Sequence, residues 1–102
     1  MKRWRAMAAL SCCISLQVSS VEAANPFRGQ QLYQMHCAAC HGIRGEGIIP
    51  EAPKFQRGER LDKPDMLLMQ SVRSGKNIMP PFFGLLKDQE ILEVLLYIRT
   101  LR

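Results

Sequence analysis

The sequence predicts an all-α fold, with three main helices joined by long loops around one bound group. Three segments combine helix-start signals with apolar residues spaced three and four apart, and stretches rich in glycine and proline separate them. No segment shows the alternating pattern of a strand. The chain has 102 residues, which allows one domain at most. A domain this small is rarely stable through its hydrophobic core alone, so an additional stabilising element, such as a cross-link or a bound group, is expected.

The first residues are not part of that domain. A positive start is followed by an apolar run at residues 6–16 and by small residues at Ala23 and Ala24, which is typical of a secretory signal peptide. The basic residues are Lys2, Arg3 and Arg5. We therefore expect residues 1–24 to be a cleaved signal peptide, with cleavage after Ala23 or Ala24, and residues 25–102 to form the mature domain in the periplasm.

Two other fates of the leader stay open. An uncleaved membrane anchor would need roughly 20 apolar residues, more than this run provides, so no stable membrane insertion is expected after cleavage. Cys12 or Cys13 could carry a lipid, but Leu10-Ser11-Cys12-Cys13 only half meets the lipidation pattern.

The first and second helices have clear starts. Asn25 is the expected N-cap and Pro26 the first residue of a helix that runs to about Met35. Its expected apolar side is formed by Phe27, Leu32, Tyr33 and Met35. The second helix starts at Pro64-Asp65, runs to about Arg73 and stops at Gly75.

The third helix is expected at Gln89 to about Leu101, with Asp88 as its cap. Its buried stripe is formed by Ile91, Val94, Leu95, Ile98 and Leu101. Residues 42–61 and 75–84 are long loops, which are uncommon in so small a domain unless they have a function. Wrapping over a bound cofactor would be such a function.

The pentapeptide Cys37-Ala38-Ala39-Cys40-His41 has the C-x-x-C-H pattern of c-type haem attachment. Spaced three apart on a helical turn, both sulfurs can bond one porphyrin, and His41 can bind its iron as the proximal ligand. The pattern predicts one haem c, covalently attached through Cys37 and Cys40. A thioredoxin-like thiol pair would need a strand before the motif. A zinc site formed with His36 would lack a second cluster of ligands.

Met79 is the expected distal iron ligand. It lies in a loop, and Pro80 favours an extended conformation that projects the thioether from the backbone. Met35 and His36 directly precede the attachment turn and cannot reach the other face of the ring. Met66 and Met69 lie three apart on a predicted helix and are expected to belong to the core.

With these residues placed, the chain resembles the class I cytochromes c, especially the short bacterial monohaem kind, and the resemblance implies their fold. Gly29 and Tyr33 look like the residues where the family's first helix crosses the last, with Tyr97 as their partner. Pro53 resembles the proline whose carbonyl accepts a hydrogen bond from the proximal imidazole, which makes it part of the cofactor site. The segment 73–82 closely resembles the one that carries the distal methionine. Two departures are Phe55, where leucine is commoner, and Lys87, where Ser or Thr usually precedes the last helix.

These residues predict a periplasmic electron carrier with a closed Met/His iron site, and not an enzyme. An apolar wall is expected to keep the ring dry, formed by Phe55, Leu67, Val72, Ile78 and Phe82. The expected partners are redox proteins (a dehydrogenase, an oxidase or a reductase), and the protein is expected to be a monomer or a subunit of a complex. The alternative is a haem subunit bound to a periplasmic dehydrogenase, and a third possibility is a haem that opens to bind a small ligand.

The charge of the mature part is mildly positive. Once the leader is removed, 11 Lys and Arg stand against 8 Asp and Glu, a net +3. This charge is too weak and too dispersed for nucleic-acid binding, but it suits docking on an acidic partner. A basic docking ring around the haem edge is a further hypothesis, made of Arg44, Lys54, Arg57, Arg60, Arg73, Lys76 and Lys87.

Overall fold

The computed structural model describes residues 3, 7–17 and 23–102. Residues 1–2, 4–6 and 18–22 of the predicted signal peptide lie outside this range, and they include the basic residues Lys2 and Arg5. Residues 7–17 contain no helix. In the described part of the chain, no helix has both the length and the apolar character needed to cross a membrane.

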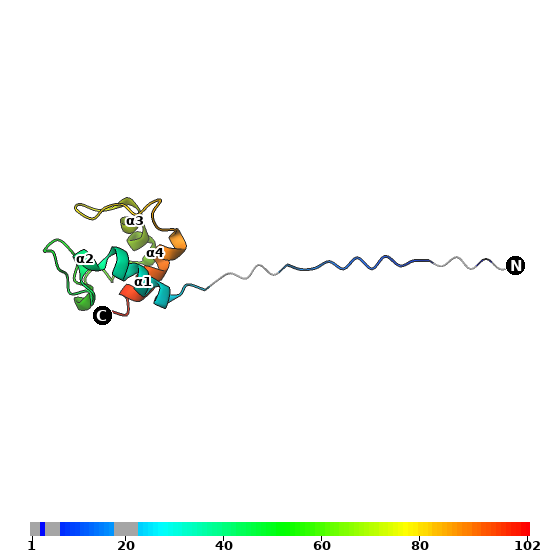
Figure 1. Cartoon of the computed structure of the whole chain (residues 1–102), viewed down its shortest axis with the longest axis horizontal. Coiled ribbons are helices and arrows are strands. Elements are labelled where there is room, and N and C mark those ends of the chain that lie inside the picture. Colours follow the sequence, from blue (N-terminus) through cyan, green and yellow to red (C-terminus); the bar gives the residue numbers. More distant parts are fainter. Residues whose placement is uncertain (1–2, 4–6, 18–22) are drawn as a thin grey trace.

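Four α-helices and one short 3-10 turn form the body of the molecule (Figure 1). They are α1 (Pro26–His36), α2 (Ala38–His41), η1 (Phe55–Arg57), α3 (Asp65–Ser74) and α4 (Asp88–Ile98). Residues 23–102 contain no strand, only isolated bridges between Lys76 and Met79 and between Phe83 and Leu86. The predicted all-α fold is therefore confirmed.

The start of α1 and the end of α3 lie where the sequence signals predicted them. The Asn25 side chain accepts a hydrogen bond from the Phe27 backbone N–H at 2.9 Å, and Pro26 occupies the first turn. Helix α3 stops at Gly75, whose φ of 74° lies in the left-handed region that favours glycine.

The ends of α4 differ from the prediction. The N-cap is Lys87, and Asp88 is the first helical residue. The Lys87 backbone N–H donates to the Glu90 carboxylate at 3.0 Å, and this bond holds the pKa of Glu90 below its ordinary value. The helix ends at Ile98, because the backbone N–H of Leu101 bonds back to Ile98 over three residues rather than four.

The centre of the fold is the crossing of α1 and α4, which makes the largest helix–helix contact in the described residues. The helices approach so closely at Gly29 that a Cβ there would run into the backbone carbonyl of Glu93. One turn on, the Tyr33 ring meets the Tyr97 ring edge-on, with centroids 5.3 Å apart. The glycine and tyrosine positions expected at the crossing are thus in contact. Tyr33 and Ile91 are completely buried beside them.

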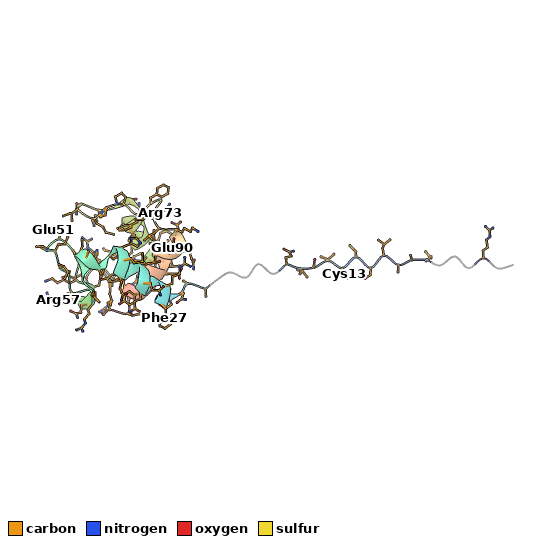
Figure 2. The ribbon with its side chains drawn as sticks, viewed as in Figure 1. Cys13, Phe27, Glu51, Arg57, Arg73 and Glu90 are labelled. Atoms are coloured by element: carbon orange, nitrogen blue, oxygen red, sulfur yellow. The ribbon has the colours of Figure 1, made fainter. Side chains whose placement is uncertain are left out.

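Three residues expected on apolar faces are exposed instead. Phe27 is 77 % exposed at the outer end of α1 (Figure 2), Met35 is 74 % exposed, and Met66 is 76 % exposed. The prediction was wrong for them because α1 packs through a narrow stripe centred on Gly29 and Tyr33, while only Leu68, Met69 and Val72 of α3 pack against the core.

Arg99, just after α4, ties the C-terminus to the segment before α3. Its guanidinium donates to the carbonyls of Leu61 at 2.8 Å and Lys63 at 3.0 Å, and to the Asp65 carboxylate at 2.7 and 3.0 Å. This set of bonds fixes the start of α3 against the end of α4, and α3 forms one wall of the cleft described next.

Candidate haem site

A cleft of about 880 Å³ opens between the attachment turn, the 51–55 loop, α3, the 75–82 loop and the inner face of α4. Its wall is mostly apolar, and its volume is within the range of cofactor sites. The wall contains every residue that the sequence assigned to the haem: Cys37, Cys40, His41, Pro53 and Met79. Residues from both ends of the domain therefore meet around one space.

The turn between α1 and α2 presents the two thiols. Cys37 ends α1, and the His41 backbone N–H donates to the Cys37 carbonyl at 2.9 Å, which closes one helical turn from Cys37 to His41. No disulfide joins Cys37 to Cys40, so both sulfurs are available for attachment to a cofactor. Burial, with a smaller effect of Cys40, raises the pKa of Cys37 to about 11, so this thiol is protonated at neutral pH.

The His41 side chain is buried and held from two sides. Its Nδ1 lies 3.4 Å from the Pro53 carbonyl oxygen, and its ring stacks on Phe55 with centroids 4.6 Å apart and planes 15° apart. Burial lowers the pKa of His41, which keeps the imidazole neutral. With the proton on Nδ1 facing Pro53, the lone pair of Nε2 is available to a metal.

The loop after α3 presents Met79 on a tight turn. Lys76 and Met79 exchange both backbone hydrogen bonds, at 2.9 and 3.0 Å. Asn77, within the turn, has a φ of 54°. Gly75 leaves room for this turn, because a Cβ there would stand 2.7 Å from the Met79 carbonyl oxygen. Met79 is half-buried and lines the cleft.

The expected apolar wall is present. The cleft is lined by Phe55, Leu67, Val72, Ile78 and Phe82. His36 also lines it, whereas Met35, Met66 and Met69 do not. An apolar lining excludes water and lowers the local dielectric, which suits a buried macrocycle.

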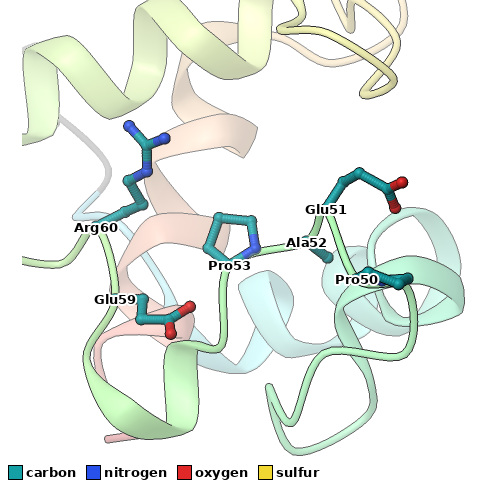
Figure 3. A pocket seen from close by; sticks show the side chains of 6 residues that line it. All are labelled: Pro50, Glu51, Ala52, Pro53, Glu59 and Arg60. Carbon is teal, nitrogen blue, oxygen red and sulfur yellow. The ribbon is translucent and has the colours of Figure 1, made fainter.

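The 50–60 loop contributes two charged residues to the cleft: Glu51, which the sequence did not single out, and Arg60, which belongs to the hypothesised basic ring. A hollow of about 380 Å³ adjoins it, and Figure 3 shows Arg60 and Glu51 on either side of Pro53. Arg60 adopts a left-handed φ of 68°, and both Arg60 and Glu51 also line the main cleft. The sequence placed Arg60 near the haem edge, but a left-handed arginine has no sequence signature, so this backbone conformation was not predicted.

The proposed basic ring is only partly gathered at the cleft. Arg60 and Lys76 line it, as does Lys63, which the sequence analysis did not include. Arg73 instead pairs with Asp88 at 3.3 Å and lies over the Phe83 ring, 5.9 Å from its centroid.

Two thiols on one helical turn, a neutral buried imidazole and a thioether facing the same apolar cleft fit a covalently held haem. Thiols can form thioether bonds to it, and the imidazole and thioether are donors that iron accepts. Fold and site together thus define the class: a c-type cytochrome with a single haem.

Comparison with known proteins agrees with this class. The family described as "Cytochrome C oxidase, cbb3-type, subunit III" matches residues 24–98. The "Cytochrome c6" of Thermosynechococcus vestitus is 33 % identical over 94 residues, which cover 88 % of this chain and 81 % of that protein. The "Cytochrome c6-like" protein of Nostoc sp. is 33 % identical over 89 residues, covering 83 % and 78 %. The chain belongs to the cytochrome c family, as a class I monohaem member.

Membership of this family settles the cofactor and the kind of activity. The protein carries covalently bound haem c, and Cys37, Cys40 and His41 fit the attachment motif. It is an electron carrier and not an enzyme. The thiol-exchange and zinc interpretations of the motif are thereby set aside.

Proposed function

We propose that this chain is exported, loses residues 1–24 and transfers single electrons in the periplasm through a haem with His41 and Met79 as axial ligands. One observation supports the ligand pair above all: both residues line the cleft that Cys37 and Cys40 border, although they come from segments far apart in the sequence. A thioether and an imidazole are a common axial pair in this class of haem site.

The bound haem supplies reversible one-electron exchange between ferric and ferrous iron. The chain's own residues adapt it to this task. Pro53 and Phe55 hold the His41 ring in one orientation, and burial favours its neutral, metal-binding form. The soft thioether of Met79 favours ferrous iron and raises the potential above that of a bis-histidine site. With His41 and Met79 both bound to the iron, no iron position would be left for a substrate.

The partners are redox proteins, a dehydrogenase, an oxidase or a reductase, that dock transiently at the mouth of the cleft. Arg60, Lys63 and Lys76 are exposed there and give this surface several positive charges beside Glu51. Such charge favours encounter with an acidic partner and makes the association rate fall with salt.

A second candidate is a haem subunit held in a larger redox complex, such as a periplasmic dehydrogenase. The match to a family described by an oxidase subunit favours it. Purification from native membranes and soluble extracts separates the two: a free carrier elutes alone, and a subunit elutes with a larger partner that contains its own redox centre.

Replacing the distal ligand tests the proposal. Met79→Ala is expected to abolish the weak near-infrared sulfur-to-iron band, to lower the midpoint potential and to allow rapid CO binding to the reduced protein. The matched control is Met69→Ala, because Met69 is half-buried against the core and does not line the cleft. If Met79→Ala retained the band and the potential, the distal assignment would be wrong. His41→Ala is expected to prevent a stable low-spin holoprotein.

Export is tested separately. The intact mass of protein purified from the periplasm is expected to lack residues 1–24 or 1–23 and to include one haem. A mass that includes the complete leader would contradict cleavage.

A further inference from the structure

Glu93 is a buried carboxylate at the crossing of α1 and α4. It is 2 % exposed. Its Oε2 accepts a hydrogen bond from the Asn25 backbone N–H at 3.1 Å, and its Oε1 lies 3.7 Å from the Arg28 guanidinium. The Arg28 side chain is 44 % exposed and also contacts Glu90 at 3.4 Å. A buried negative charge is thus matched by one neutral N–H and by one long contact to a shared, exposed cation, which is weak compensation.

The start of α1 lacks negative charge of its own. Its first turn contains no acidic residue, although the N-terminus of a helix carries a partial positive charge. A further positive charge at this end would be unfavourable without a nearby anion. Glu93 supplies that anion from α4.

We propose that Glu93 is the binding site for the new α-amino group that signal-peptide removal creates. The inference rests on the proposed export and cleavage. A peptidase hydrolyses one peptide bond with one water, which leaves a carboxylate on the leader and an amino group that takes up a proton on the domain. After a cut behind Ala24, this ammonium is the Asn25 nitrogen, 3.1 Å from Glu93. After a cut behind Ala23, the ammonium is the Ala24 nitrogen, which lies one residue, about 3.8 Å, before the Asn25 nitrogen.

Cleavage therefore replaces a neutral hydrogen bond with a charge-assisted one. Such bonds are about twice as strong as neutral ones. In the precursor the same nitrogen is an amide that cannot take a charge. Maturation would thus stabilise the helix crossing only after the leader has been removed.

The ion pair gives stability a defined dependence on pH. The α-amino group has a pKa of about 7.7–8.0 in an unfolded chain, and pairing with Glu93 raises it in the folded state. The contribution is then fully present below the unfolded pKa and is lost as the pH rises through the folded pKa. In the described contacts of this corner, the charged groups facing the amino group are Arg28 from α1 and Glu90 and Glu93 from α4.

The test compares three oxidised holoproteins by denaturant unfolding between about pH 6 and about pH 10: the natural mature protein, one with a short neutral Gly-Ser extension before Ala24, and Glu93→Gln. Glutamine keeps an acceptor for the N–H but removes the charge. For the mature protein, the folding equilibrium constant should fall about tenfold for each unit by which folding raises the α-amino pKa. Both altered proteins should lack this fall.

Each outcome decides the matter. Equal pH profiles for the mature and extended proteins would overturn the inference while leaving export and cleavage intact, and this comparison holds even if Glu93→Gln does not fold. An intact mass that shows a retained leader would overturn the inference together with the proposed export. The covalent haem spectrum is unaffected by either result, so failure of the haem assignment is recognised independently.

Discussion

Gly29 is the position where one added methyl group should damage the fold most. At the crossing, a Cβ on residue 29 would overlap the backbone carbonyl of Glu93 and stand 3.0 Å from the Val94 nitrogen. These are backbone atoms of α4, which cannot turn aside as the end of a side chain can. The Gly29→Ala change therefore forces α1 and α4 apart by on the order of 1 Å.

The expected cost follows from two opposing effects. Overpacking a tight contact costs about 1–3 kcal/mol, and the upper end applies because the obstacle is backbone. Alanine is about 1 kcal/mol better than glycine inside a helix, which offsets part of this cost. The free energy of unfolding should therefore fall by about 2 kcal/mol, roughly a thirtyfold change in the folding equilibrium constant. The separation of α1 and α4 would also loosen the contacts of the completely buried Tyr33 and Ile91.

Denaturant unfolding of the holoprotein measures this difference. The matched control is Gln31→Ala, an exposed position two residues along the same helix, which should change the unfolding free energy by less than about 0.5 kcal/mol. If Gly29→Ala were as stable as the natural protein or more so, the close approach of α1 and α4 would be wrong.

Three further changes test other parts of the structure. Arg99→Ala removes four hydrogen bonds and should lower the unfolding free energy by about 1–3 kcal/mol in a denaturant titration, whereas an unchanged midpoint would mean that the Asp65 contact contributes nothing. Asn77→Val places a β-branched residue at a φ of 54°, so it should lower the unfolding free energy by about 1–2 kcal/mol and weaken the near-infrared band. Asn77→Gly should preserve the stability and the band. Equal behaviour of the two variants would argue against the turn. Met66→Ala should be nearly neutral in thermal unfolding and Met69→Ala should cost about 1–2 kcal/mol, and the reverse order would contradict their exposure.

The features that the sequence predicted correctly are local ones, formed by residues close together in the chain. The Asn25-Pro26 start, the Gly75 stop and the C-x-x-C-H turn each lie within a few residues, so the chain itself encodes them. The resemblance to the cytochromes c added the longer-range pairing of Tyr33 with Tyr97.

Features that depend on segments far apart were missed. Nothing in the sequence connects Glu93 with Asn25, 68 residues away, because a glutamate beside an apolar stripe usually faces water. The same holds for Arg99, which reaches the segment 61–65 only because α4 ends beside it. Hydrophobic spacing also could not show that Met66 faces outward, since α3 covers the core with only part of its surface.

The absorption spectrum of the mature protein, oxidised and then reduced, tests the central claim most directly. Covalent haem with methionine ligation predicts sharp α and β bands in the reduced protein, a near-infrared sulfur-to-iron band in the oxidised protein, and haem that stays with the polypeptide in acid–acetone. A spectrum that lacks the near-infrared band, with the haem still attached, would contradict Met79 as a ligand. Haem that acid–acetone extracts would contradict attachment through Cys37 and Cys40.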